Sequence, residues 1–285
     1  MPGIRIVTDS ACDLPPATAE QHGITIVPLT VRISDTEYVD RRDLTPDEFW
    51  RKSTDAKQLP ETAAPSPGAF EQAYRDLAAQ GATGVVCVTI SSELSATFQS
   101  AQLGADAVKD TIPVRVIDSR TVTIAQGLLA IAGAEAAAAG KGIDDVTAVI
   151  EAKIPHMRVF AALDTLENLK KGGRIGAARA ALGSMLNIKP LIQVENGAVG
   201  EAGKQRTRSR SLDQLIELAK ENGAANAKSL AVMHGQAPDL DGFVDKLCAA
   251  LGRSRDDILI GDIGSVVGTH TGARVIGIAY DAAEA

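Results

Sequence analysis

Three short apolar runs in the first half of the chain end alike, and they constrain the fold more than any other feature. Residues 4–10 (IRIVTDS), 84–91 (GVVCVTIS) and 114–119 (VRVIDS) each pass from branched apolar residues into Asp or Ser. Residues 95–109, between the last two runs, have helical spacing. Strands that alternate with helices form βαβ units and a mostly parallel sheet, so we predict an α/β, Rossmann-like domain with a polar site at the carboxyl ends of its strands. The alternative is that the terminal Asp and Ser residues only cap the following helices.

The second half of the chain has the pattern of an α+β, two-layer domain. Strand-like runs follow one another from about residue 158, and residues 195–197 (ENG) have the composition of a hairpin turn. Helical spacing is confined to stretches between some of these runs. Because Pro155 interrupts a helix near this point, we predict an N-terminal domain over residues 1–157 and a C-terminal domain over residues 158–285.

Charge and cysteine usage argue against several classes of protein. A net charge of -7 argues against a nucleic-acid-binding protein, which would need a strong local basic patch. Cys12, Cys87 and Cys248 are far apart and form no C-x-x-C pair, so we expect reduced thiols, a cytoplasmic location and no local zinc site. The long apolar stretch at 122–140 contains polar residues, and we predict a buried helix there rather than a transmembrane segment.

Two basic stretches are candidate anion sites. In residues 169–176 (LKKGGRIG), two glycines flanked by lysines and Arg174 would let backbone N–H groups and cations converge on an anion, although Gly172 could simply end a helix. In residues 203–210 (GKQRTRSR), a strand would align four cations on one face. Such a stripe favours phosphate or an acidic partner surface, with an ordinary solvated face as the alternative. The four cations are Lys204, Arg206, Arg208 and Arg210.

A hydroxyl-rich stretch and one histidine are the remaining candidates. Residues 89–101 (TISSELSATFQSA) place several hydroxyls just after a predicted strand, and several hydroxyls near a helix start suit anion binding better than the activation of one oxygen. The glycines around His270 predict a tight loop between strands that holds its imidazole in a cleft, although a lone histidine is more often structural. No G-x-S-x-G motif is present, so a hydrolase that uses Ser92 and His270 is the second hypothesis.

Taken in order, these stretches resemble the DegV family, the fatty-acid-binding subunits of bacterial fatty acid kinase. The resemblance runs nearly from end to end, and the order and spacing of its segments make it specific. The segments are TDSACDLP, PETAAPSPGAF, TISSELSATFQSA, VIDSRTVTIAQGLL, TLENLKKGGRIGAARAALGSMLNIKPL, GKQRTR and VGTHTG.

The resemblance implies a two-domain protein that encloses one long-chain fatty acid in an apolar tunnel between the domains. A separate ATP-dependent kinase subunit, related to dihydroxyacetone kinases, would phosphorylate the exposed carboxylate, and the acyl phosphate would enter phospholipid synthesis. On this basis we expect a cytoplasmic monomer that has no catalytic residues, cofactor, metal or nucleic-acid partner.

The resemblance also implies roles for individual residues. Thr62, Ser91 or Ser92, and His270 match positions that hold the carboxylate, while Arg174 and Arg206 match arginines of the head group and the kinase contact. Two departures stand out. Ala63 and Ala64 replace a Ser-Gln pair, which removes a hydroxyl donor, and Ala273 and Arg274 replace a Pro-Gly pair. We predict that Arg274 strengthens capture of the head group; the alternative is that this protein binds a different acid. The predicted ligand-binding set is Thr62, Ser91, Ser92, His270, Thr271 and Arg274.

Overall fold

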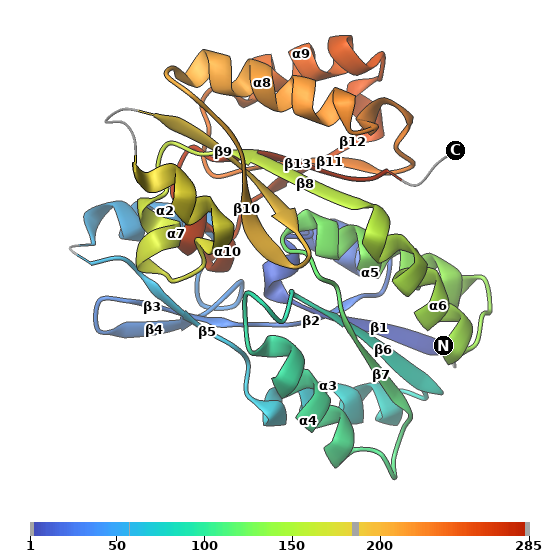
Figure 1. The fold of residues 1–285 in the computed structure, drawn as a ribbon. Coiled ribbons are helices and arrows are strands. Elements are labelled where there is room, and N and C mark those ends of the chain that lie inside the picture. Colours follow the sequence, from blue (N-terminus) through green and yellow to red (C-terminus); the bar gives the residue numbers. More distant parts are fainter. Residues whose placement is uncertain (1–2, 57, 184–187, 283–285) are drawn as a thin grey trace.

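The first domain is built on a parallel sheet, in a computed structural model that describes residues 3–56, 58–183 and 188–282 (Figure 1). Its four strands lie in the order β2-β1-β6-β7, and the three predicted strands are confirmed. The strand β6 is buried along its whole length because helices cover both faces of the sheet, which explains its unbroken apolar run. The strands are β1 (Ile4–Asp9), β2 (Thr25–Val27), β6 (Gly84–Thr89) and β7 (Val114–Asp118).

Helices cover the two faces of this sheet in pairs (Figure 1). The apolar stretch at 122–140 forms α5, which is buried between the two domains, so the predicted buried helix is confirmed. Among the described residues, no helix is long and apolar enough to cross a membrane. One face carries α3 (Pro67–Ala79) and α4 (Thr97–Ala107), the other α5 (Ile124–Ala138) and α6 (Ile143–Lys153); α1 (Pro16–Gln21) and the 3-10 helices η1 (Ser10–Cys12) and η2 (Ile154–His156) lie in connections.

A small antiparallel sheet branches from the first domain. The apolar run at 24–33 divides at Pro28, which cannot donate a ladder hydrogen bond, into β2 of the large sheet and β3 of the small one. The strand order is β4-β3-β5, and α2 begins with a capping box between Thr45 and Glu48. These elements are β3 (Thr30–Ile33), β4 (Thr36–Val39), β5 (Glu61–Ala63) and α2 (Pro46–Asp55).

The second domain contains a six-stranded mixed sheet in the order β10-β9-β8-β13-β11-β12. The predicted hairpin is confirmed: β9 and β10 meet at Asn196 and Gly197, both with positive φ, as tight hairpin turns require. Helices α8 and α9 cover the outer face of the sheet, and α5, α7 and α10 lie on its inner side (Figure 1). The strands are β8 (Met157–Ala162), β9 (Lys189–Glu195), β10 (Ala198–Gln205), β11 (Leu230–His234), β12 (Ile258–Asp262) and β13 (Ile276–Asp281).

The predicted stripe of four cations is wrong. Strand β10 ends at Gln205, and the Thr207 side chain caps a helix that starts at Arg208, so the four side chains do not share a strand face. Arg208 instead forms two hydrogen bonds with Asp239. The helices of this domain are α7 (Glu167–Lys171), α8 (Arg208–Glu221), α9 (Leu240–Leu251) and α10 (Ser265–Thr271), with 3-10 helices η3 (Gly176–Gly183), η4 (Ala224–Asn226) and η5 (Arg255–Asp257).

Buried polar contacts fix the start of α10 against the first domain. The Asp13 carboxylate accepts hydrogen bonds from Thr123 Oγ1 at 2.7 Å and from the backbone N of Gly264 at 2.9 Å, and Ser265 Oγ donates to Asp40. Carboxylates suit a helix start because its first N–H groups lack partners within the helix. These contacts position α10, and with it His270, between the domains.

Candidate functional site

An apolar cavity of about 180 Å³ lies between the two domains. Branched aliphatic side chains from the inner face of the large mixed sheet and from the first domain make up most of its wall, together with residues of α10. One apolar cluster of buried residues extends through both domains around it. The wall includes Ile90, Val122, Val159, Ala161, Ile192, Val194 and Val199.

Polar side chains lie at one end of this cavity, which we call the head end: Thr62, Ser95, Arg174 and His270. Thr62 is on β5 of the small sheet and His270 is on α10, yet Thr62 Oγ1 lies 3.0 Å from His270 Nε2. The two residues are 208 positions apart in the sequence. The fold thus brings together two residues that the family resemblance assigns to the same head-group site.

His270 occupies a helix and not the predicted loop between strands. It is the penultimate residue of α10, which ends where Gly272 adopts a φ of 78°. Its imidazole packs against Gly172, where a Cβ atom would lie 2.3 Å from Nδ1, so only glycine fits there. Burial, and after it the positive charge of Arg174, lower the pKa of His270 to about 4. The imidazole is therefore neutral at pH 7.

Arg174 is held at the head end by two backbone carbonyls. Its Nε donates to Leu94 O at 3.0 Å, and its Nη1 donates to Gly172 O at 2.7 Å. The alternative interpretation of Gly172 is confirmed, because this glycine is the C-cap of α7, whose last residue is Lys171. Arg174 therefore places a cation beside the hydroxyls of Thr62 and Ser95. Among the described residues, no acidic side chain lies at hydrogen-bonding distance from its guanidinium.

The head end opens into a second hollow of about 330 Å³, which we call the vestibule. Thr62, Arg174 and His270 line both the cavity and the vestibule, so they mark the boundary between the two. Lys171 and Glu61 add charges to the vestibule, and Leu59 and Pro60 add apolar surface. A ligand in the cavity would meet its polar groups here.

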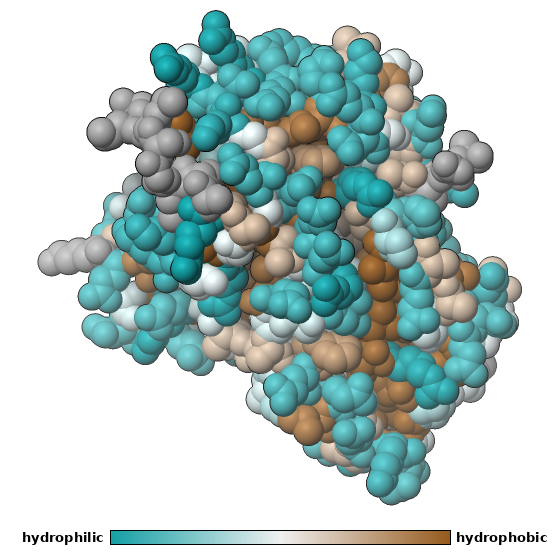
Figure 2. All heavy atoms as spheres, viewed as in Figure 1, coloured by the Kyte–Doolittle hydropathy of each residue, from teal (hydrophilic) through white to brown (hydrophobic). Residues whose placement is uncertain are grey.

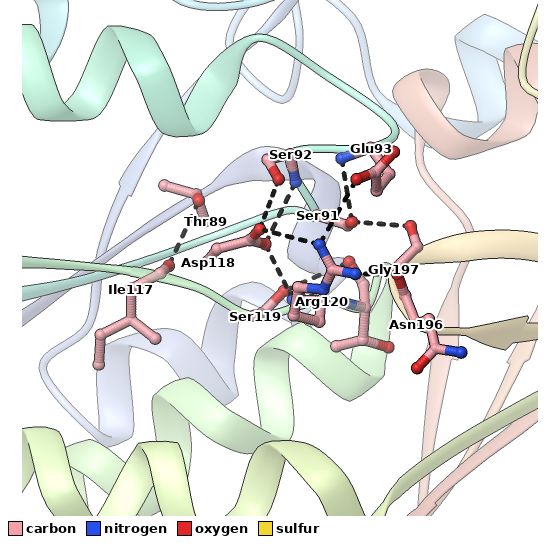
Figure 3. Close-up of polar contacts among 11 residues, drawn as sticks. Thr89, Ser91, Ser92, Glu93, Ile117, Asp118, Ser119, Arg120, Asn196 and Gly197 are labelled. Carbon is pink, nitrogen blue, oxygen red and sulfur yellow. Dashed lines mark hydrogen bonds and ion pairs between the residues drawn. The ribbon is translucent and has the colours of Figure 1, made fainter.

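The hydroxyls of the loop after β6 divide between two places (Figure 3). Ser91 Oγ donates to Gly197 O of the hairpin at 2.7 Å, and Ser92 Oγ donates to Asp118 Oδ2 at 2.5 Å. Neither serine lines the cavity, whereas Ser95 does. Ser95 is the first residue of the stretch at 95–109 that has helical spacing. The L-S pair at 94–95 carries no signal that separates it from the other hydroxyls in this stretch.

Arg120 completes the attachment of the hairpin to the first domain (Figure 3). Its guanidinium donates to Asn196 O and lies 3.6 Å from Glu93 and 3.9 Å from Asp118. A Cβ atom at Gly197 would lie 2.6 Å from Ser91 Oγ, so this turn needs glycine for close approach as well as for its φ of 86°. We call the contacts of Ser91 and Arg120 with the hairpin turn the latch.

The other predicted site residues lie at varying distances from the head end. Thr271 lines the cavity, but its hydroxyl donates to Val267 O within α10. Arg274 is exposed and its Nε lies 3.7 Å from Asp164, outside the cavity and the vestibule. Arg206 is exposed in the loop between β10 and α8.

The two alanines that depart from the family pattern lie in different surroundings: Ala64 lines the cavity, and Ala63 is exposed. Residues 184–187 of the family-like segment lie outside the described residues.

Neither the Ser–His pair of the hydrolase hypothesis nor a metal site is found among the described residues. Ser92 bonds to Asp118 and His270 bonds to Thr62, so the Ser92–His270 pair of the second hypothesis is not formed. Within residues 3–56, 58–183 and 188–282, no cluster of His, Cys, Asp and Glu could hold a metal ion. What the site offers is an apolar enclosure with one cation and two hydroxyls at its mouth.

Comparison with known proteins gives consistent matches over almost the whole chain. A family model described as "Uncharacterised protein, DegV family" matches residues 3–283. A DegV domain-containing protein of Streptomyces coelicolor is 35% identical over 281 residues, which cover 96% of this chain and 97% of that protein. A DegV domain-containing protein of Clostridium perfringens is 33% identical and covers 97% and 98%.

Solved structures agree with the fold. A DegV family protein of Thermus thermophilus, described by its fatty acid binding, superposes with a TM-score of 0.88 at 30% identity and covers 98% of this chain and 99% of that one. A stearic acid-binding protein of Eubacterium ventriosum superposes with a TM-score of 0.89, also at 30% identity, and covers 98% of each chain.

Proposed function

The chain belongs to the DegV family, and from that premise we propose that it binds one long-chain fatty acid in the cavity and presents the carboxylate at the vestibule to an ATP-dependent kinase subunit. The observation that carries the proposal is the apolar cavity that ends at Thr62, Ser95, Arg174 and His270. Each methylene buried there contributes about 0.8 kcal/mol. The fatty-acid binding described for the Thermus and Eubacterium relatives supports the same class of ligand.

Arg174 supplies the positive charge for the carboxylate. His270 is neutral in the protein without ligand, because burial and Arg174 lower its pKa to about 4. With its proton on Nε2, His270 donates to Thr62 Oγ1, and the Thr62 hydroxyl is then free to donate to the ligand. Hydrogen bonds from a cation and a hydroxyl to a carboxylate are of the stronger, charge-assisted kind.

The position of the carboxylate at the vestibule suits transfer of a phosphoryl group by a partner. Ser92 bonds to Asp118 and not to His270, so the hydrolase pair is not formed, and in this proposal the kinase subunit, related to dihydroxyacetone kinases, performs the chemistry. Arg174 and Lys171, at the cavity mouth, would offset the added charge of an acyl phosphate.

Native mass spectrometry tests the binding. Protein purified without added lipid is expected to carry an adduct that dissociates as a long-chain fatty acid. After delipidation, the protein should bind palmitic acid far more tightly than hexadecanol, which has the same chain without the carboxylate. A protein that carries no acyl chain and binds neither compound would contradict the proposal.

The kinase step needs its own test. A fatty acid kinase subunit, ATP and palmitate should produce acyl phosphate, trapped with hydroxylamine as the hydroxamate, only when this chain is present. Equal product in its absence would overturn the role as a presenting subunit while leaving fatty acid binding intact.

A further inference from the structure

The register of the strands gives the cavity a direction. Strand β8 runs toward α7 and Arg174, so its C-terminal residues lie nearest the head end. Ala161 pairs with Ile192 of β9, and both line the cavity. Val159 and Val194 lie two residues farther along their strands in the opposite direction, about 7 Å away by strand geometry. They therefore form the end of the cavity opposite the head end, which we call the distal end.

A third space, larger than both the cavity and the vestibule, begins behind these two valines, and we call it the hollow. It has a volume of about 570 Å³, and Val159 and Val194 line it as well as the cavity. Its other walls are mostly polar, with apolar surface from Ile154, Pro155, Met157 and Phe160; the polar wall residues are Arg120, Thr121, Arg158, Gln193, Glu195, Asn196 and Asn222. No other residue that lines the cavity also lines this hollow. Within the described residues, these two side chains are thus the shared wall.

The hollow exists because β8 and β9 separate at this point. Their pairing runs from Ala162 and Leu191 to Phe160 and Gln193, and no pairing between these strands continues among the described residues beyond it. Arg158 Nη1 donates to Met157 O at 3.1 Å and to Pro155 O at 2.8 Å, which satisfies carbonyls near the open edge. The β8–β9 ladder is absent there in the described part of the chain, and Val159 and Val194 lie between the two spaces.

The hairpin turn forms the other side of the hollow. Asn196 and Arg120 line it, and the bond between them belongs to the latch. Figure 2 shows a strip of apolar residues between the hairpin and α6 on a face that is otherwise largely hydrophilic. The latch holds the turn against the first domain, on the side where β9 is no longer paired with β8.

We propose that Val159 and Val194 are a partition that closes the acyl site against the polar hollow between β8 and β9, and that this partition sets the length of the chain accommodated. The inference rests on the proposed function and adds the residues that select among fatty acids. Chains that fill the cavity end at the partition. Longer chains must displace these side chains and place methylenes against the polar walls of the hollow.

A matched pair of valine variants tests the partition. Val194 and Val199 face each other across the hairpin and both line the cavity, but only Val194 lines the hollow. Delipidated protein is titrated with lauric, palmitic, stearic, arachidic and behenic acids in competition with a fluorescent fatty acid. Val194→Ala should raise affinity for the long acids relative to palmitate by about fourfold for each methylene that gains burial. Val199→Ala should leave the ratio unchanged.

A second substitution guards against a general loss of packing. Val194→Leu should thicken the partition and shift the preference toward shorter acids, opposite to Val194→Ala. Unchanged ratios in both Val194 variants, or the same shift in Val199→Ala, would overturn the partition. Absence of binding by the unmodified protein would instead overturn the proposed function, so the two failures are distinguishable.

Discussion

Two groups of hydroxyls in this protein differ in what the fold leaves for a ligand. Ser91 and Ser92 form hydrogen bonds with a hairpin carbonyl and with a carboxylate, and they line no part of the cavity. Thr62 and Ser95 line the cavity, and their partners are an imidazole and another hydroxyl, which can change roles as donor or acceptor. A polar side chain at the right place in a motif is therefore a ligand group only when the protein has not already satisfied it.

The largest expected effect concerns His270, the imidazole partner of Thr62. It is an effect on the stability of the protein at acid pH. The pKa of His270 is about 4 in the folded protein, below the ordinary histidine value of 6.5. Its neutral form contributes stability that is fully present above pH 6.5 and is lost as the pH falls toward 4. Relative to His270→Gln, delipidated protein should lose about 3 kcal/mol of unfolding free energy over this interval.

Urea unfolding measured across this pH range gives the comparison for His270. His156→Gln, at an exposed histidine of η2, is the control and should follow the unmodified protein. Parallel curves for the unmodified protein and His270→Gln would mean that His270 is not held neutral by burial.

The next effect separates two arginines that the sequence analysis had placed together. Arg174 lies at the head end, whereas Arg206 is exposed between β10 and α8. Loss of a hydrogen bond to a charged group costs about 1.5–3 kcal/mol, so Arg174→Gln should weaken palmitate binding by about tenfold or more. Arg206→Gln should leave affinity unchanged in the same competition assay, and equal losses would contradict the assignment.

Serine substitutions test the comparison within one loop. Ser95→Ala removes a hydroxyl that lines the cavity, and about 1 kcal/mol of lost hydrogen bonding corresponds to about fivefold weaker binding of palmitate. Thr62→Val should act in the same direction. Ser92→Ala, whose hydroxyl bonds to Asp118, should change affinity little. If calorimetry shows Ser92→Ala to be the more damaging of the two serine variants, the family-based assignment of Ser92 is the correct one.

The smallest effect concerns the latch. Ser91→Ala removes the hydrogen bond to Gly197 O and should lower the unfolding free energy by about 1 kcal/mol. Affinity for palmitate should stay within the error of the measurement, because Ser91 does not line the cavity. Thermal unfolding with and without palmitate measures both quantities, and a ligand-induced stabilisation that disappears in the variant would place Ser91 in the site.

Local patterns predicted much of the secondary structure. Apolar runs that end in Asp or Ser marked β1, β6 and β7, and the ENG turn marked the β9–β10 hairpin. The patterns failed where a cap or a packing contact decided the outcome. Thr207 starts α8 and ends the expected cationic strand, and the glycines near His270 serve helix packing and termination, not a loop between strands.

The sequence by itself determined the family, the parallel first half, the hairpin and the candidates Thr62, Arg174 and His270. Only the tertiary structure decided which candidates meet. Thr62 bonds to a residue 208 positions away, and Ser91 bonds to one 106 positions away. Motifs and periodicities report neighbours along the chain, whereas the partners that satisfy a hydroxyl or bury an imidazole come from distant segments. For the same reason, no sequence pattern marks the two valines at the distal end of the cavity. Their position becomes clear only from the separation of β8 and β9 in the folded protein.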